Sequence, residues 1–486
     1  MGVTVRRIAG DSLVYGLTGL ATPILGLFTV PFVARSLTTA EYGVLELVMT
    51  TVYLAAVFLD MGLSSAMFRY FLDVPPDQRE SRREIVSSAL GLMFSSSLAI
   101  ALVSIAISGP IGNALGDGGR TIVILASVTL PLTTLAQLTR ETMRLQFKPW
   151  RFFASALLGA IPTAVLAVVA VTWLDLGVSG VVGAGVVGLV ASSSYGLVQA
   201  RQLLGARFSS SAISRMLAFG LPLVPGTLSI WGMAYADRLI LGAFSGVDEV
   251  GIYAIANRIT QPVGLLASAL TIAYYPLMFD LARDRPEYER VVRRYMGRAS
   301  LLLGLCLSLV LAAAAPELIS ILAPGYDRAA QVVGTLGIGL SLYSLVSVLV
   351  GSFLVMKRTG LTAVFCILAA VLNIGLCVSL VPAFGAAGAA TGTACGYAFL
   401  AGMYLRFGVR NEPEAHDVRR LLMAFLIGVI AIALTGIIIE TTSGFTSLLL
   451  RMACVGAFGL ATLAFGVISP RHVTRVLREL RGATTP

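Results

Sequence analysis

Long runs of apolar residues, separated by short polar or Gly/Pro-rich stretches, follow one another along the whole chain. A helix needs about 20 apolar residues to cross the hydrocarbon core of a bilayer. By this criterion the pattern predicts fourteen membrane-spanning helices and an all-α polytopic membrane protein. Their expected limits are 11–33, 42–66, 85–108, 121–141, 152–173, 179–199, 217–243, 250–280, 299–321, 329–356, 361–380, 385–405, 421–439 and 447–468.

The composition agrees with this pattern. The 486 residues are 57% hydrophobic and only 12% charged, whereas a soluble domain carries roughly 25% charged residues. These proportions exclude a water-soluble enzyme, a disulfide scaffold and a disordered chain. The five cysteines lie in apolar runs without metal-ligand spacing, so we interpret them as small core residues.

The basic residues set the expected orientation. Of the 35 lysines and arginines, 29 fall in alternate polar segments that share one side with the N-terminus. Cytoplasmic segments are enriched in Lys and Arg, so we expect both termini in the cytoplasm and no nucleic-acid partner. The basic tail Arg471–Arg481 is expected to touch membrane lipids. Six arginines remain: Arg35, Arg120, Arg328 and Arg451 at expected outer ends or loops, and Arg238 and Arg258 inside spans 7 and 8.

The sequence also repeats itself at an offset near 208 residues. Glu41-Tyr42-Gly43 aligns with Glu249-Val250-Gly251, and Gly177, Gly180 and Gly188 align with Gly385, Gly388 and Gly396. Because six spans is an even number, the two halves have the same orientation, as in transporters with parallel repeats. The expected organisation is an N-lobe at 1–200 (spans 1–6), a cytoplasmic linker at 201–216, a C-lobe at 217–406 (spans 7–12), and spans 13–14 with a basic tail at 407–486.

No motif indicates catalysis, a metal or a cofactor. The GxGxxG at 183–188 lies inside an apolar helix and follows no strand, so close helix packing explains it better than dinucleotide binding. The GxxxG steps at Gly388, Gly392 and Gly396 have the same explanation. We therefore expect a protein without enzymatic activity.

Ionisable groups within spans are costly and mark functional sites. The charged candidates are Glu46 and Asp60 on span 2, Asp237 and Arg238 on span 7, and Arg258 on span 8. For Arg258 two roles stay open: bidentate binding of a phosphate, or a structural pair with Asp237 or Asp60. For Asp60, a role as a helix-end residue near the cytoplasmic interface is slightly favoured over a role in the cavity. Adjacent Asp237 and Arg238 point to different helix faces and are not expected to pair.

Two polar residues complete the candidate cavity lining. Asn373 lies in the middle of span 11, where interhelical hydrogen bonding is the first expectation and substrate contact the second. Asn257 directly precedes Arg258 on span 8.

Several segments resemble the polysaccharide transporter (O-antigen flippase) branch of the multidrug/oligosaccharidyl-lipid/polysaccharide (MOP) exporter superfamily. They are the stretch 29–43 with Leu-Asp-Met-Gly-Leu at 59–63 and Arg69, Gly-Leu-Pro-Leu-Val-Pro at 220–225, Ala-Asp-Arg-Leu-Ile-Leu-Gly at 236–242, Gly-Ile-Tyr at 251–253, and Leu-Asn-Ile at 372–374 with 381–382 and 385–390. The resemblance implies a flippase for glycans linked to undecaprenyl pyrophosphate.

The segment 256–262 also resembles span 8 of lipid II flippases, in which an arginine lines the central cavity. This resemblance carries over to Arg258 only. The arginine cluster of span 1 in those flippases is absent, since span 1 here has only Arg35 at its outer end. The difference argues for a lipid-linked glycan other than the peptidoglycan precursor.

We therefore expect a flippase that moves a lipid-linked oligosaccharide or polysaccharide repeat unit across the cytoplasmic membrane of a prokaryote by alternating access. Glycosyltransferases and a polymerase of the same pathway are expected partners. The first alternative is an ion-coupled drug antiporter of the same superfamily, against which the extra pair of spans counts. A membrane glycan polymerase or ligase is the second, and the short outer loops argue against it.

Overall fold

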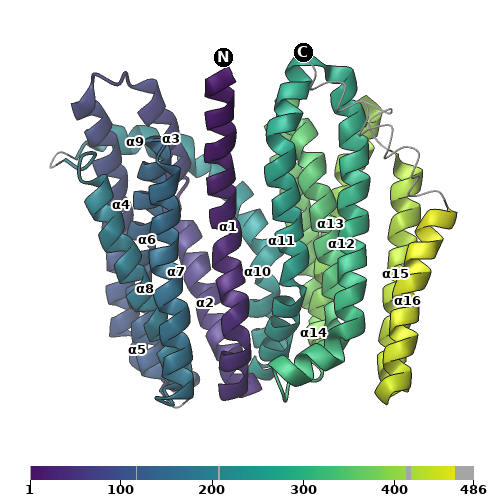
Figure 1. The fold of residues 1–486 in the computed structure, drawn as a ribbon. Helices are drawn as coiled ribbons and strands as arrows, with labels where there is room; N and C mark the ends of the chain where they lie inside the picture. The colour runs from purple at the N-terminus through teal and green to yellow at the C-terminus, as the bar shows by residue number, and fades with distance from the viewer. Residues whose placement is uncertain (1, 117, 206–207, 412–416, 466–486) are drawn as a thin grey trace. The chain divides into compact units, whose positions relative to one another are not determined.

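The computed structural model describes residues 2–116, 118–205, 208–411 and 417–465. These residues form helices joined by short connections, with no strand among them (Figure 1). The helices are α1 (Gly2–Ser36), α2 (Thr39–Asp60), α3 (Leu63–Asp73), α4 (Arg79–Ala106), α5 (Ser108–Ala114), α6 (Gly119–Leu145), α7 (Pro149–Thr172), α8 (Gly177–Ala200), α9 (Ser210–Gly220), the 3₁₀ helix η1 (Leu221–Leu223), α10 (Val224–Phe244), α11 (Val247–Asp284), α12 (Pro286–Leu322), α13 (Ala329–Val355), α14 (Thr359–Asn411), α15 (Val418–Thr441) and α16 (Gly444–Ala464).

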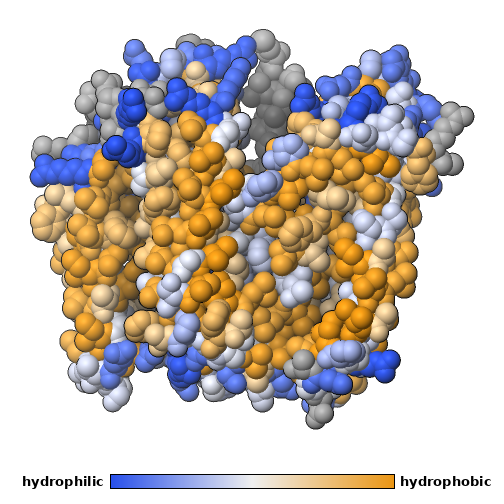
Figure 2. Space-filling model, turned by 180° about the vertical axis from the view of Figure 1, so that it is seen from behind, coloured by the Kyte–Doolittle hydropathy of each residue, from blue (hydrophilic) through white to orange (hydrophobic). Residues whose placement is uncertain are grey.

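Thirteen helical segments of the described residues are long and apolar enough to cross a membrane. The segment Thr359–Gly408 counts once among them, although its 50 residues would extend about 75 Å as one straight helix, well over twice the thickness of the hydrocarbon core. Gly385 interrupts it with φ 54° and ψ −132°, so α14 contains both predicted spans 11 and 12. The prediction of about fourteen spans in an all-α membrane protein is confirmed. On the face seen in Figure 2, hydrophobic residues cover the helix walls and hydrophilic residues gather at the helix ends.

Local boundaries differ from the prediction in two places, and one arginine is more deeply buried than a helix-end position predicts. The expected break at 381–384 is helical, and the chain bends only at Gly385. Part of the Gly-rich stretch at 109–120 folds into the short helix α5. Arg451, expected at the outer end of span 14, lies within α16 and is only 2% exposed. In each case, the local sequence signal was a polar or flexible residue whose surroundings are set by packing.

The chain divides into two compact units. Unit 1 comprises Met1–Arg258, Leu318–Ala329 and Thr359–Gly396, and unit 2 comprises Ile259–Glu317, Ala330–Arg358 and Tyr397–Pro486. In unit 1, buried residues of α3, α4, α6 and α9, among them Leu63, Met67 and Leu138, form one apolar cluster. In unit 2, a smaller cluster joins α11, α12 and α13 around Tyr274 and Met278.

The internal repeat is visible in a reciprocal contact between the first turns of α2 and α11. A Cβ atom at Gly43 would overlap the carbonyl oxygen of Val247, and a Cβ atom at Gly251 would overlap that of Thr39. Val247 and Gly251 are the equivalents of Thr39 and Gly43 at the repeat offset of 208 residues. Such an exchange of equivalent contacts is the property of a two-fold interface. Both positions therefore require glycine, because a side chain would separate the two helices.

A second equivalence lies at the starts of α8 and the second half of α14. Gly177 and Gly385, the repeat equivalents, both adopt the left-handed conformation, with φ of +53° and +54°. The repeat-related glutamates lie beside them. Glu249 accepts a hydrogen bond of 3.0 Å from the amide of Ala386, and a Cβ atom on Gly177 would lie 3.9 Å from Glu41 Oε1. The two halves thus share backbone geometry as well as sequence.

The glycine motifs in the spans serve close packing. A Cβ atom at Gly188 would overlap the Thr163 hydroxyl of α7, and one at Gly396 would lie 2.9 Å from Cβ of Asn373. These contacts support helix packing as the explanation of both motifs. Gly185, in the same GxGxxG, has nothing within 4 Å of an added Cβ and lines a cavity described below.

Candidate functional site

Four charged side chains meet inside unit 1. Glu46 comes from the middle of α2, Asp237 and Arg238 from α10, and Arg258 from α11. Charges within the hydrocarbon region are tolerated when they pair or face a wet cavity. The two carboxylates and two guanidinium groups balance in formal charge, so the cluster is neutral as a whole.

The Arg238 guanidinium contacts two carboxylates and one backbone carbonyl group. Its Nε lies 2.8 Å from Glu46 Oε1 and its Nη1 lies 3.0 Å from Asp237 Oδ1. Nη1 also donates to the carbonyl oxygen of Ala234 at 2.7 Å. Its side chain is only 4% exposed. Arg238 therefore holds α2 against α10.

The expectation that Asp237 and Arg238 do not pair is wrong. Asp237 Oδ1 accepts a 2.8 Å hydrogen bond from the Arg238 backbone amide, which draws the carboxylate toward the next residue. The Arg238 side chain is long enough to bend back to the same oxygen. Adjacent positions on a helix diverge at Cβ, but this divergence does not restrict a side chain as long as arginine.

Arg258 is held more loosely. Its Nη2 lies 3.6 Å from Glu46 Oε2. Its side chain is 37% exposed, about nine times the fraction of Arg238. Its ion-pair partner is Glu46, so the expected pairing with Asp237 or Asp60 is corrected. The other oxygen of Glu46, Oε1, already accepts from Arg238, so Arg258 contacts only one oxygen of this carboxylate.

A chain of hydrogen bonds runs from Asp237 into α14. Asp237 Oδ2 accepts from the Tyr253 hydroxyl and, at 3.3 Å, from Thr393 Oγ1. Asn373 Nδ2 donates to Thr393 Oγ1 at 3.4 Å. Asn373 is completely buried, and its Oδ1 has no hydrogen-bond partner among the described residues. The hydrogen bond to Thr393 agrees with the interhelical role expected for Asn373. The Oδ1 acceptor of Asn373 is not used by any described residue.

The remaining two predicted site residues are Asp60 and Asn257. Asp60 is the last residue of α2, and it accepts hydrogen bonds from Ser64 and from Gln137 Nε2, the latter at 3.3 Å. These contacts agree with the helix-end role. Asn257 is partly buried next to Arg258 on α11.

Two residues of the site escaped sequence reasoning: Tyr253 and Thr393. A hydroxyl in the middle of an apolar run was their only signal, and many other Ser, Thr and Tyr residues of this chain carry the same signal. Glu46 was recognised as a buried charge, but its role as the shared carboxylate of two arginines depends on three helices meeting.

Unit 2 contains a different buried ion pair, between α16 and α12. Arg451 Nη1 and Nη2 lie 3.0 and 2.5 Å from the two oxygens of Glu317. Nη1 also donates to the carbonyl oxygen of Ala313 at 2.6 Å and Nε to that of Ser447 at 3.2 Å. Four of the five N–H donors of this arginine have acceptors, so we interpret it as structural.

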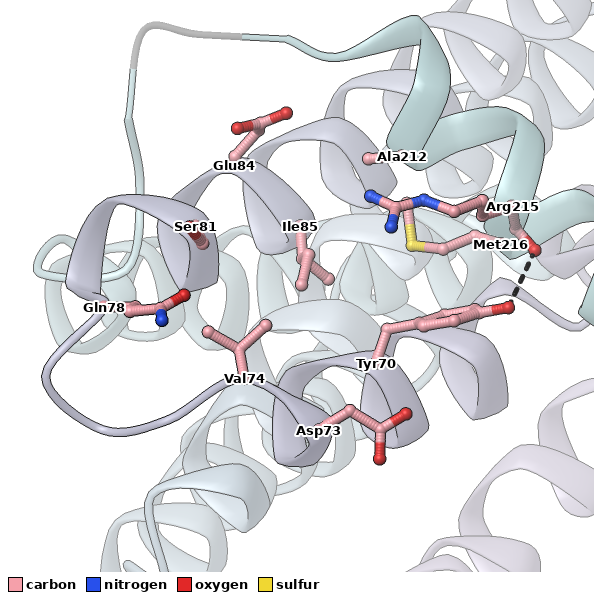
Figure 3. A pocket seen from close by; sticks show the side chains of 10 residues that line it. All are labelled: Tyr70, Asp73, Val74, Gln78, Ser81, Glu84, Ile85, Ala212, Arg215 and Met216. Carbon is pink, nitrogen blue, oxygen red and sulfur yellow. Dashed lines mark hydrogen bonds between the residues drawn. The ribbon is translucent and has the colours of Figure 1, made fainter.

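A cavity of about 450 Å³ lies among α3, α4 and α9 (Figure 3). Tyr70 donates to the carbonyl oxygen of Arg215 across it at 3.3 Å. Asp73 and Glu84 line it together with the Arg215 side chain. None of the candidates predicted from sequence lines this cavity, so it is separate from the charged cluster.

The comparisons with known proteins agree with this architecture. A family model described as "Polysaccharide biosynthesis protein" matches residues 32–323, more than half of the chain. The chain belongs to this family. No curated protein sequence matches it.

Solved structures extend the likeness to the whole fold. The chain is similar to the lipid II flippase MurJ in its inward closed conformation, with a TM-score of 0.73 and 14% identity over 93% of this chain and 98% of that chain. It is also similar to an inward-facing multidrug resistance MATE family transporter of the MOP superfamily, with a TM-score of 0.65 and 16% identity over 88% and 100%. A MATE structure in complex with MaL6 follows, with a TM-score of 0.58 and 18% identity over 85% and 96%. The family model confirms the expected polysaccharide family, and the solved structures, at identities this low, show the fold alone.

Proposed function

We propose that this protein is a flippase that moves a polyprenyl-pyrophosphate-linked oligosaccharide or polysaccharide repeat unit across the cytoplasmic membrane. Arg258 is the observation that carries the proposal. It is the more exposed arginine of the cluster, and it shares its carboxylate with a second guanidinium. A guanidinium with spare donors binds a phosphate through two hydrogen bonds, and a pyrophosphate is the group common to such donors. Membership of the polysaccharide biosynthesis family supports a glycan cargo.

The proposed mechanism is alternating access between the N-lobe, 1–200, and the C-lobe, 217–406. In the proposed orientation, the first turns of α2 and α11 lie at the outer face. The close contact of Gly43 with Gly251 and the hydrogen bond from Thr39 Oγ1 to Asp248 Oδ1 support a closed outer end. Release of cargo to the outside would require these helices to separate.

The decisive test uses the full chain in liposomes with a fluorescent polyprenyl-pyrophosphate oligosaccharide and a membrane-impermeant quencher. We expect the protein to make the inner-leaflet probe accessible faster than protein-free liposomes do. Arg258→Ala is expected to abolish most of the increase. Unchanged accessibility in the presence of active, correctly folded protein would contradict the proposal.

The second candidate is a drug or small-molecule antiporter, favoured by the fold shared with MATE transporters. The same liposomes, loaded with a fluorescent organic cation and given a proton or sodium gradient, distinguish the two. Gradient-driven cation release without any effect on the glycan probe would establish the antiporter. The additional pair of spans formed by α15 and α16 supports the flippase instead.

Cross-linking tests the outer contact. We expect a bifunctional thiol reagent that joins Thr39→Cys to Asp248→Cys to stop transport, because the cargo leaves at this end. Cleaving the reagent is expected to restore transport. The variants are made after replacement of the five native cysteines, all of which are free thiols. Each single cysteine is the control, and full transport by the cross-linked protein would rule out an outer gate at this contact.

Thiol labelling tests the proposed orientation with both termini in the cytoplasm. We expect Asn113→Cys to react with an impermeant thiol reagent in intact cells and Gln78→Cys to react only after permeabilisation. Both side chains are exposed and each lies in or beside a short connection. Asn113 is preferable to the nearby Gly118, whose φ of +74° would strain a cysteine. The reverse labelling pattern would invert the topology.

A further inference from the structure

A second cavity of unit 1 contains an arginine that the charged cluster does not use. This cavity has a volume of about 570 Å³ and lies among α1, α2, α6, α7 and α8. Arg140 of α6 lines it, together with Ser192 of α8 and Phe152 of α7. The volume falls within the range of roughly 300–1,000 Å³ that is usual for small-ligand sites.

Among the described side chains, no carboxylate forms an ion pair with Arg140. Over the described residues, its only hydrogen bond runs from Nη1 to Ser192 Oγ, at 3.4 Å. The neighbouring Glu141 pairs instead with Arg144, whose Nη1 lies 3.0 Å from Glu141 Oε2. Arg140 is partly buried and lies five residues before the end of α6. A guanidinium in this position is expected to have an anion nearby, because an uncompensated charge in a span is costly.

Four of the hydroxyl groups in the cavity do not offer protons to that anion. Thr18, Thr29, Thr129 and Thr163 line the cavity, and each donates to a carbonyl oxygen three or four residues earlier in its own helix. Such local hydrogen bonds are typical of Ser and Thr in helices. What these residues present to the cavity is therefore methyl groups and acceptor lone pairs. Positive charge is concentrated at Arg140, and the rest of the wall suits an apolar body.

None of the four charged residues of the cluster lines this cavity, and two aromatic rings link the two sites. Tyr53 of α2 lines the cavity, and its ring centroid lies 5.6 Å from that of Tyr235 on α10. The guanidinium of Arg238 lies 5.1 Å from the centroid of the same Tyr235 ring. A ligand at Arg140 would therefore be distinct from one at Arg258.

We propose that this cavity binds a single-chain amphiphile through a phosphate headgroup, with the phosphate on Arg140 and the apolar chain along the threonine-lined wall. The site is additional to the proposed flippase site and does not depend on transport. It requires one anionic group and one apolar chain in the same molecule. Free phosphate would not use the apolar wall, and a neutral lipid would not use Arg140.

The test is photolabelling of the purified full chain in a neutral maltoside detergent. The probe is dodecyl phosphate with a diazirine near the end of its chain, and the matched neutral probe is the corresponding dodecanol. We expect the phosphate probe to label peptides of α1, α6, α7 or α8. Arg140→Gln is expected to weaken its apparent affinity about tenfold, the effect of one charge-assisted hydrogen bond.

Two further variants make the test specific. Gly185→Leu fills the cavity from α8 without a clash at Cβ, and we expect it to prevent labelling while Arg140 is retained. Arg144→Gln removes an exposed arginine one turn away and is expected to leave labelling unchanged. Monodisperse size-exclusion profiles confirm that each variant is folded.

Three results would overturn the proposal. Equal labelling by the dodecanol probe would mean that the cavity is only apolar. Full competition by inorganic phosphate at the concentration of the amphiphile would identify a free-anion site. Undiminished labelling of Arg140→Gln would show that the arginine does not bind the headgroup. Because binding is measured without transport, none of these results bears on the proposed flippase activity.

Discussion

Two arginines within membrane spans, Arg258 in unit 1 and Arg451 in unit 2, have very different surroundings in one protein. Arg451 is 2% exposed and binds both oxygens of Glu317 as well as two backbone carbonyl groups. Arg258 is 37% exposed and lies 3.6 Å from one oxygen of a carboxylate that also pairs with Arg238.

The two arginines differ in the number of hydrogen-bond acceptors that each guanidinium contacts. Every donor that Arg451 directs into the protein meets an acceptor at hydrogen-bond distance, so a ligand could bind it only by breaking the ion pair. Arg258 retains N–H donors that contact no carboxylate, and its side chain is accessible to a ligand. Arg238 is adjacent to Arg258 in space but resembles Arg451 in its contacts. Under the proposed function, residual hydrogen-bonding capacity is what would distinguish Arg258 from the two structural arginines.

The largest expected effect concerns stability at Arg451. We expect Arg451→Ala to lower the free energy of unfolding by about 3 kcal/mol, the lower end of the range for a broken buried pair, because Glu317 is 42% exposed and can regain water. Thermal unfolding and the amount of folded protein in the membrane measure this loss. Transport per folded molecule is expected to stay within about twofold of wild type. Normal stability of the variant would remove the distinction between the two arginines.

The next effect concerns transport at Arg258. We expect Arg258→Ala to lower glycan transport more than tenfold, which corresponds to about 1.4 kcal/mol or more, at normal abundance. Arg258→Lys is expected to retain part of the activity, since lysine keeps the charge but not the two-pronged geometry. A structural role predicts instead reduced abundance of Arg258→Ala and recovery when Glu46→Gln is added. Transport and abundance measured for all of these variants decide between the roles.

The smallest effect concerns the hydrogen-bond chain behind the cluster. We expect Tyr253→Phe to cost about 1 kcal/mol of stability, the value of one hydrogen bond, because Asp237 keeps Arg238 and Thr393 as partners. The drop in unfolding temperature is expected to be clearly smaller than that of Arg451→Ala. A loss as large as that of Arg451→Ala would mean that Tyr253, rather than Arg238, is the main partner of Asp237.

Much of the fold could be predicted from the sequence because membrane spans are determined locally. A segment in the hydrocarbon region must satisfy its own backbone hydrogen bonds and present apolar side chains, so length and hydropathy suffice to recognise it. The repeat could also be recognised in the sequence, because a close backbone contact requires glycine at both Gly43 and Gly251. The costly residues Glu46, Asp237, Arg238, Arg258 and Asn373 could also be named in advance, because polar groups are rare in spans.

What only the tertiary structure decided is which of these groups meet. Arg238 and Glu46 are 192 residues apart, and the Arg451–Glu317 pair joins residues 134 apart. No local pattern specifies that Glu46 pairs with two arginines, that Asp237 pairs with its neighbour Arg238, or that Arg140 lines a cavity and donates to Ser192. An ion pair in the membrane depends on distances of a few ångströms between helices, and these distances follow from how the small residues of all the spans pack together.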